Sequence, residues 1–455
     1  MIQWSPTHRP LERRPGGARK IQAAPPLILS LSFIAIILLG TLLLKIPAAT
    51  TESITWVQSL FTATSAVTVT GLVVVDTGTA FTPLGQSIIA VLIQLGGLGL
   101  MTFAVVTLVA VGSKISFLQQ SALKEAFNQT DTASLVSTAK GVLLFAFIVE
   151  SLGIVILTLY WLPDMGWQKS LFHAFFYTIS AFNNAGFALS ADSLMPYVSD
   201  PTINIVITAL FITGGLGFSV WLDIVKKRRW RTLSSYSKAM LSATLIINIV
   251  ALLLIYAIEY NNPATLASLD TLGKWLAAWF QAVTPRTAGF NTLDIGQMKD
   301  ASVTLMLLLM FIGGGSMSTA SGIKLVTFMV LLLATYNYFR RDPAPTLFNR
   351  TIKPETVTKA LALTLISLGV TWIAIFLLSI TEHNAAFSDI VFEAVSALGT
   401  VGLSRGLTGN LSQPGEFIII LLMYAGRLGP LTLAYFLASP RQRRVRYPEA
   451  RLPIG

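Results

Sequence analysis

The sequence predicts an all-α integral membrane protein built from four tandem repeats. Charged residues make up only 12% of the 455 residues, about half the share that is usual in soluble domains. Apolar residues gather in blocks long enough to cross a bilayer, which takes about 20 residues each. Two glycine-centred motifs then recur four times along the chain. Together these observations predict four units, each a helix, a half-helix and a second helix, arranged with pseudo-fourfold symmetry around a central pore.

The apolar blocks alternate with shorter, less apolar stretches. Each short stretch is too short to span a bilayer, so it predicts a re-entrant half-helix, which is tolerated at membrane depth only when protein or a water path surrounds it. The first block is too long for the apolar region of a signal peptide and is interpreted as an uncleaved helix. The blocks lie near 26–47, 84–112, 139–162, 202–222, 239–258, 302–335, 358–380 and 416–438, and the short stretches at 53–66, 169–182, 271–284 and 387–398.

The basic residues indicate the orientation. The two tails and the linkers after the second, fourth and sixth blocks hold 24 of the 32 Lys and Arg residues but 7 of the 21 acids, whereas the remaining loops hold 6 basic and 13 acidic residues. Basic loops stay in the cytoplasm, so the chain is predicted to be multi-pass with both termini cytoplasmic. The net charge of +11 is therefore attributed to topology, and no nucleic-acid partner is expected.

Few residues are available for metal or thiol chemistry. The chain has no cysteine and only three histidines, which lie far apart. This composition excludes a disulfide scaffold and a thiolate metal site, and disfavours a histidine metal centre.

The first repeated motif is a glycine turn directly after each short stretch. Its four copies are separated by 115, 103 and 113 residues, glycine to glycine. The upstream segments also match, although the third is one residue shorter: Phe61–Ala66, Phe176–Ala181, Phe280–Thr284 and Phe392–Ala397. The turns themselves are Val69-Thr70-Gly71-Leu72, Asn184-Ala185-Gly186-Phe187, Thr287-Ala288-Gly289-Phe290 and Thr400-Val401-Gly402-Leu403.

The second motif lies in the following long helix, 25, 28, 24 and 24 residues after the first. Its copies are Gly96-Gly97-Leu98-Gly99, Gly214-Gly215-Leu216-Gly217, Gly313-Gly314-Gly315-Ser316 and Gly426-Arg427-Leu428-Gly429. The predicted division of the chain is a basic cytoplasmic N-tail, four repeats and a basic cytoplasmic C-tail: 1–24, 25–112, 113–231 (with a cytoplasmic linker), 232–340, 341–440 and 441–455.

The glycine turns are the candidate ion-binding residues. Rings of backbone carbonyls replace the water shell of a cation and select it, and glycine permits the backbone angles that aim carbonyls at an axis. Thr400-Val401-Gly402 also matches the first three residues of the potassium-channel filter. All sixteen turn residues are therefore predicted to form a selectivity filter that binds potassium through backbone carbonyls. The half-helix dipoles and the acidic outer loops both favour a cation.

A polar interruption lies in the long helix of the third unit, from Gly313 to Gly322. Its unpaired backbone groups exclude contact with lipid, so it either lines the pore as a loop or is a kink for close helix packing. Its candidate gate residues are Gly313, Gly314, Gly315, Ser316, Ser318, Thr319, Ser321 and Gly322.

Charged residues inside the apolar blocks are costly to bury and are expected to have a bonding partner or a function. Arg427 aligns with Gly97, Gly215 and Gly314 and is added to the candidate gate; the alternative is an ion pair with Glu150. Lys324 is interpreted as reaching toward the cytoplasmic interface. Glu150 is interpreted as a buried, hydrogen-bonded acid rather than a cation ligand. Arg286 either tunes the ring or anchors outer-loop carbonyls and acids.

The four glycine turns, together with the segment Met310–Lys324, resemble those of the Trk/Ktr/HKT superfamily of potassium transporters, most closely those of the membrane subunits of Ktr potassium uptake systems. The resemblance covers residues from about 25 to 440. It implies sodium-stimulated potassium uptake across the bacterial inner (plasma) membrane by a homodimer with one pore per subunit. It also implies that Gly313–Gly322 closes the pore, that Arg427 belongs to the barrier, and that a cytosolic RCK/KTN-type ring (KtrA) gates it. ATP or ADP is expected on that ring, and on this chain only potassium, with sodium possible.

Two other classes of function were compared with a pore. An alternating-access carrier is often built from inverted repeats, whereas these four run in one direction. A membrane-embedded enzyme needs a nucleophile and base or a metal cluster, but away from their ends the blocks contain only Glu150, Lys324 and Arg427 as charged residues. The sequence therefore predicts a pore and not an enzyme.

Overall fold

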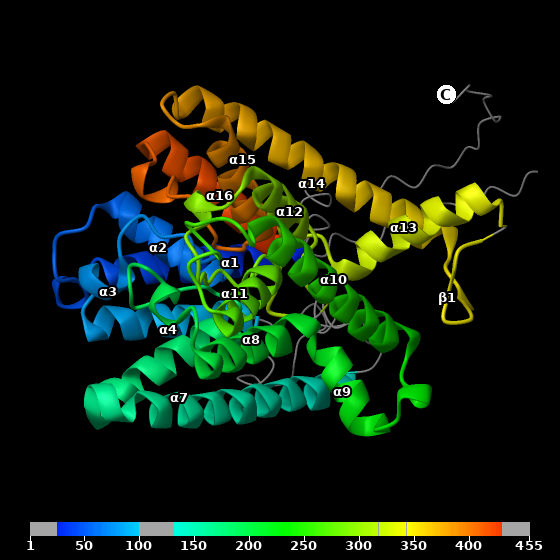
Figure 1. The fold of residues 1–455 in the computed structure, drawn as a ribbon, viewed down its shortest axis with the longest axis horizontal. Coiled ribbons are helices and arrows are strands. Elements are labelled where there is room, and N and C mark those ends of the chain that lie inside the picture. The colour runs from blue at the N-terminus through cyan, green and yellow to red at the C-terminus, as the bar shows by residue number, and fades with distance from the viewer. Residues whose placement is uncertain (1–24, 100–131, 317, 343, 430–455) are drawn as a thin grey trace, which may run out of the picture.

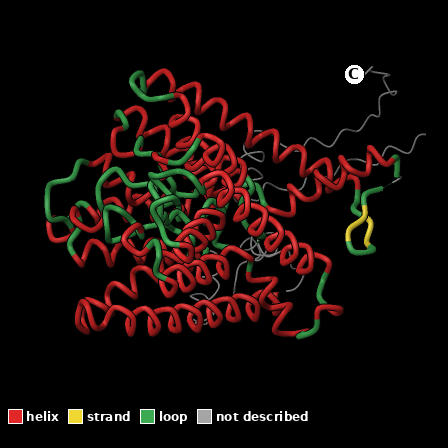
Figure 2. Tube along the Cα trace, viewed as in Figure 1, coloured by secondary structure: helices red, strands yellow, loops and turns green. Residues whose placement is uncertain are grey.

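The computed structural model describes residues 25–99, 132–316, 318–342 and 344–429, which form a bundle of helices (Figure 1). Loops gather in the middle of the bundle, surrounded by helices (Figure 2). The predicted tails 1–24 and 441–455, and most of the first linker, lie outside the described residues.

The helices follow the predicted order of long helix, half-helix and long helix. The first unit contains α1 (Pro25–Leu44), α2 (Trp56–Thr68) and α4 (Pro83–Gly97). The second contains α7 (Thr132–Phe182), α8 (Pro201–Leu216) and α9 (Phe218–Lys227). The third contains α10 (Ser235–Glu259), α11 (Thr271–Val283), α12 (Asp300–Phe311) and α13 (Leu325–Arg340), and the fourth α14 (Pro354–Thr381), α15 (Phe387–Gly399) and α16 (Gln413–Leu428).

Short elements connect these helices. A two-stranded antiparallel hairpin joins α13 to α14 and projects from the bundle (Figure 1). The short elements are α3 (Thr77–Ala80), η1 (Pro47–Ala49), η2 (Met195–Tyr197), η3 (Trp230–Thr232), η4 (Ile295–Gln297), η5 (Thr408–Asn410), β1 (Thr346–Leu347) and β2 (Arg350–Thr351).

The half-helices begin and end where local chemistry requires. Thr55 and Gln58 form a capping box at the start of α2, which satisfies free N–H groups of the first turn. In the second unit the half-helix is the last part of α7, because Gly166 interrupts that helix with φ 72° and ψ 168°. The half-helices α2 and α15 end directly before their glycine turns, whereas one residue separates α7 from its turn and three residues separate α11 from its turn.

Several described helices are suited to a bilayer by length and composition. The apolar part of α7, together with α10 and α14, could each span a membrane, and α8 with α9 would add a fourth span that bends by 91°. Shorter apolar helices are α4, α12, α13 and the described part of α1. The third unit has two short helices instead of one long helix because residues 312–324 leave the helical conformation.

The four largest apolar cores of the described residues each combine residues of at least two units. The core around α1, α2 and α4 includes Phe187 of the second unit. The core of the second unit includes Phe290 of the third, and that of the third includes Leu403 of the fourth. The core of the fourth unit includes Leu72 of the first. The units therefore pack in a closed cycle. The residue that directly follows each turn glycine lies in the core of the preceding unit.

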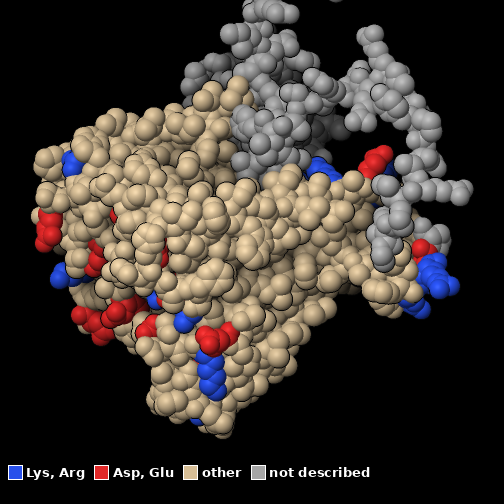
Figure 3. Space-filling model, turned by 90° about the horizontal axis from the view of Figure 1, so that it is seen from above, with Lys and Arg blue, Asp and Glu red and all other residues tan. Residues whose placement is uncertain are grey.

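Charged side chains are unevenly distributed on the face shown in Figure 3. Acidic side chains, with basic ones among them, gather in the left half of that view, basic side chains predominate toward the right end, and a broad band between them carries few charged side chains. This band matches the surface expected for contact with lipid.

Candidate functional site

The four glycine turns share one backbone conformation. Each has two residues with positive φ, the glycine itself and the residue two positions before it. The pairs are Val69 (53°) and Gly71 (90°), Asn184 (59°) and Gly186 (69°), Thr287 (68°) and Gly289 (79°), and Thr400 (47°) and Gly402 (90°). Left-handed angles at non-glycine residues are strained and are usually kept for a function. The sequence indicated the glycines but gave no signal for their left-handed partners.

A Ser or Thr residue in each half-helix holds the turn in place. Its backbone carbonyl accepts the N–H of the residue before the glycine, at 2.8 to 3.0 Å: Thr70 to Ser65, Ala185 to Ser180, Ala288 to Thr284 and Val401 to Ser396. The hydroxyls of Ser180 and Thr284 also donate to the carbonyls of Phe187 and Phe290, at 2.8 and 2.5 Å. These four residues occupy the same position in the four aligned upstream segments, but the sequence analysis gave them no role. The hydroxyl group that all four share could have indicated one.

Each glycine packs against a carbonyl of the next turn. A Cβ added to Gly71 would collide with the carbonyl oxygen of Ala185, and one on Gly186 would lie 3.0 Å from that of Ala288.

The remaining two contacts close the cycle. A Cβ on Gly289 would stand 2.6 Å from the carbonyl oxygen of Val401, and one on Gly402 would collide with that of Thr70. The structure thus brings all four predicted turns together, with a backbone carbonyl at each junction and no room for a side chain.

The four turns together form a ring, called the ring of turns below, and this ring opens into an acidic depression of about 510 Å³. All four turn glycines line it, as do Asp76, Asp192 and Asp294, and the described residues that line it include no Lys or Arg. Three carboxylates at a narrow mouth raise the local concentration of cations. The half-helices α2, α11 and α15 and the end of α7 direct their C-termini at the ring, which also favours positive charge there.

The second glycine motif allows a long helix to approach its own half-helix. A Cβ on Gly96, Gly214 or Gly426 would collide with the backbone carbonyl of Val67, Phe182 or Leu398, each four residues before a turn glycine. In the third unit the contact differs, because a Cβ on Gly313 would meet the carbonyl of Ser321. The segment 312–324 takes the place that a half-helix end has in the other units.

That segment is an ordered loop rather than a kinked helix. Gly313 N–H donates to Ile323 O at 2.7 Å, which closes the base of the loop, and Gly315 N–H donates to Gly215 O at 2.8 Å. Ser318 Oγ donates to Gly315 O within the loop at 2.7 Å. Of the two alternatives, the described residues of this run, which exclude position 317, form a loop and not a kink.

Arg427 reaches this loop from α16. Its Nη1 donates to Thr319 O at 2.5 Å and to Ser321 Oγ at 3.3 Å. Its Nη2 donates to the carbonyls of Gly96 and Gly97 at the end of α4. Arg427 is therefore held by backbone carbonyls of the loop and of α4 and by the Ser321 hydroxyl, and the alternative ion pair with Glu150 is wrong.

Glu150 instead belongs to a polar cluster between α4 and α7. Both of its carboxylate oxygens accept from Gln94 Nε2 at 2.9 Å, and Asn183 Nδ2 lies 3.4 Å from one of them. Its interpretation as a buried, hydrogen-bonded acid agrees with these contacts.

Two interpretations of buried cations need correction. Lys324 does not extend to an interface, because its Nζ turns back and donates to Ala320 O at 2.7 Å. Arg286 does not bind outer-loop groups, because it lies buried and donates to Asn248 Oδ1 at 3.2 Å and Thr244 Oγ1 at 3.4 Å on α10. Both residues are held by polar groups inside the bundle, which a one-dimensional alignment does not show.

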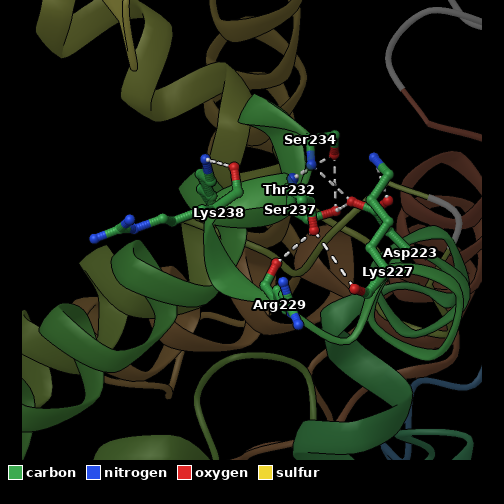
Figure 4. A network of polar contacts seen from close by, with 8 residues as sticks. Asp223, Lys227, Arg229, Thr232, Ser234, Ser237 and Lys238 are labelled. Carbon is green, nitrogen blue, oxygen red and sulfur yellow. Dashed lines mark hydrogen bonds and ion pairs between the residues drawn. The ribbon is translucent and has the colours of Figure 1, made fainter.

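A rigid corner between α9 and α10 connects the basic linker to the loop. Asp223 accepts from Lys227 Nζ, Ser234 N and Ser237 Oγ at 2.7, 2.8 and 2.7 Å (Figure 4). In the first turn of α10, Tyr236 Oη accepts the N–H of Ser316 at 2.9 Å. The corner and the loop are therefore in direct contact through Tyr236 and Ser316.

The apolar bundle, the carbonyl ring and the acidic mouth are features of a membrane transport protein for cations. Residues 20–447 match the TrkH family model, whose description is cation transport protein, and the chain belongs to this family. It is 48% identical over 96% of its length to Ktr system potassium uptake protein B of Bacillus subtilis, and 44% identical over 97% to that of Vibrio alginolyticus, covering 98% and 97% of those proteins. It is also 37% identical over 95% to potassium/sodium uptake protein NtpJ of Enterococcus hirae, covering 97% of it.

The fold is also that of a solved structure. The potassium transporter TrkH from Vibrio parahaemolyticus superposes with a TM-score of 0.74, covering 94% of this chain and 87% of that chain at 20% sequence identity. Because the relatives are named as transport proteins, the chain is a transport protein and not an enzyme.

Proposed function

We propose that the chain is the potassium-translocating pore subunit of a bacterial potassium uptake system, located in the inner membrane with both termini in the cytoplasm. The closed cycle of contacts among the four glycine turns carries this proposal. Thr70, Ala185, Ala288 and Val401 each place a backbone carbonyl beside the glycine of a neighbouring turn. Carbonyls arranged around an axis can replace the hydration shell of a cation, and the half-helix dipoles stabilise it there.

The loop 313–322 with Arg427 is proposed as the gate of this pore. The loop is fixed between α8, α10 and α16 by hydrogen bonds to Gly215, Tyr236 and Arg427. Opening requires that these bonds break or move together, which is the behaviour of an element with two discrete positions. A fixed guanidinium at the loop also repels a permeating cation.

Regulation is proposed to come from the cytosol. The basic corner at α9 and α10 is joined to the loop through Tyr236 and Ser316, so a partner that displaces the corner would bias the gate. The partner we propose is a nucleotide-binding ring of the RCK/KTN type (KtrA) that binds ATP or ADP and acts on a homodimer of this chain. Sodium stimulation is part of the same proposal.

Potassium uptake into cells that lack their own uptake systems tests the proposal. We expect this chain with the ring subunit to restore growth at low external potassium, and added sodium to increase the uptake rate. Because the Enterococcus relative is named for both potassium and sodium, sodium uptake is measured in parallel. Protein that is folded and present in the membrane but takes up neither ion would refute the assignment, and uptake of sodium alone would reassign its substrate.

A further inference from the structure

A single side-chain contact joins the loop to the ring of turns. Thr319 Oγ1 donates to Asn184 Oδ1 at 2.7 Å, and both residues are only 1% exposed. Within the described residues, this is the one hydrogen bond between a loop side chain and a residue of the four turns. Gly214 leaves space for it, because a Cβ there would stand 2.9 Å from both oxygen atoms.

Asn184 lies at a sensitive position of the second turn. It is the left-handed residue two positions before the glycine, with φ 59°, and the equivalent residues Val69, Thr287 and Thr400 carry no amide. Its Nδ2 has no hydrogen-bond partner among the described residues. The Thr319 hydroxyl is therefore the group that holds the Asn184 side chain.

Thr319 is held on its other side by the gate. Its carbonyl accepts from Arg427 Nη1 at 2.5 Å, and its N–H donates to Gly214 O at 3.4 Å. Movement of the loop away from Arg427 would carry the hydroxyl away from Asn184. The second turn would then lose the hydrogen bond from Thr319 Oγ1 to Asn184 Oδ1 that holds its left-handed residue.

We propose that Thr319 is a specificity-determining positioning residue, which supports the second turn through Asn184 and so couples potassium binding to the position of the loop. This inference rests on the proposed function of the turns and the loop. Coupling between two sites is reciprocal, so bound potassium favours the loop position in which Thr319 reaches Asn184. A closed pore then binds potassium more tightly and selects it better than one whose loop has moved.

The test is potassium binding to the purified full-length protein by titration calorimetry, with sodium as the competing ion. Thr319→Val keeps the shape but removes the hydroxyl, and we expect potassium to bind about fivefold more weakly, the effect of one hydrogen bond. Thr319→Ser should restore wild-type binding. Thr41→Val is the matched control, because this buried threonine lies outside the turns and the loop and its hydroxyl donates to Ile37 O within α1 at 2.8 Å, and it should leave potassium affinity unchanged.

A double-mutant cycle separates coupling from general loosening. Asn184→Gly tolerates the left-handed angle but lacks the amide, so it should weaken potassium binding as Thr319→Val does. The double variant should bind no more weakly than Thr319→Val alone, because both single changes remove the bond between Thr319 and Asn184, and Thr319→Val also removes the longer contact of the hydroxyl with Phe182 O at 3.4 Å. Asn184→Gly also keeps the test available if Thr319→Val does not fold.

Three results would count against the inference. Unchanged potassium affinity in Thr319→Val or Asn184→Gly, or fully additive losses in the double variant, would show that Thr319 only anchors the loop. A wild-type protein that binds no potassium would instead overturn the proposed function, and the inference with it.

Discussion

Removal of the Arg427 guanidinium should open the pathway beneath the ring of turns. Two of its hydrogen bonds hold the loop, at Thr319 O and Ser321 Oγ, and its other amino group binds the end of α4. Hydrogen bonds from a charged donor contribute about 1.5 to 3 kcal/mol each. The two loop contacts together therefore stabilise the closed position by roughly 3 kcal/mol or more.

The charge itself adds a second contribution. Two unit charges about 4 Å apart repel by about 4 kcal/mol at an effective dielectric constant near 20, which is roughly a thousandfold in rate if it is fully expressed at the barrier. Loss of the loop contacts and loss of the charge act in the same direction. We expect Arg427→Ala to raise potassium flux at saturating potassium by about 10²- to 10³-fold.

The assay is potassium uptake into proteoliposomes that contain equal amounts of folded protein. Arg427→Lys separates the two contributions, because lysine keeps the charge but not the planar fork of five donors. A lysine variant that stays closed assigns the barrier to charge, whereas one that opens assigns it to the loop contacts. Unchanged or lower flux in a folded, membrane-inserted Arg427→Ala protein would refute the whole argument.

Three further predictions test the ring, the loop and the orientation. Gly402→Ser should raise the half-saturating potassium concentration at least tenfold, because a Cβ there strikes the backbone of the first turn, whereas Gly409→Ser, where a Cβ meets nothing within 4 Å, should not; equal values for both would contradict the ring assignment. Deletion of about half of 313–322 should raise potassium flux and make uptake less dependent on the cytosolic partner ring. A deletion variant that still needs this partner for uptake would place the gate elsewhere. Cysteines at the exposed positions Glu52 and Lys226 should react with an impermeant thiol reagent from opposite sides of the membrane, in a chain with no thiol background; labelling of both from outside would reverse the predicted topology.

Features with a local cause could be predicted from the sequence. The half-helices end where the repeated strings predicted, because a turn needs glycine at φ values of 69° to 90° that other residues rarely adopt. The loop was predicted for a similar reason, since a polar run of Gly, Ser and Thr cannot face lipid. Alignment of Arg427 with three glycines singled it out as a candidate gate residue, and in the structure it donates to the carbonyl of Thr319 in that loop.

Features that depend on distant partners could not be predicted. Lys324 had no visible reason to fold back on Ala320, and Arg286 none to choose Asn248 on α10. Both are cations inside an apolar bundle, where any oxygen within reach can serve as a partner. Which oxygen lies within reach depends on how separate helices cross.

The sequence by itself determined the membrane class and the positions of the turn glycines, because composition, block length and glycine spacing act along the chain. Only the tertiary structure decided that Gly71, Gly186, Gly289 and Gly402 meet the carbonyls of neighbouring turns in a closed cycle. It alone also placed the Thr319 hydroxyl 2.7 Å from Asn184, across 135 residues of chain. A hydrogen bond depends on a few tenths of an ångström and on direction, and only the packing of the helices provides that precision.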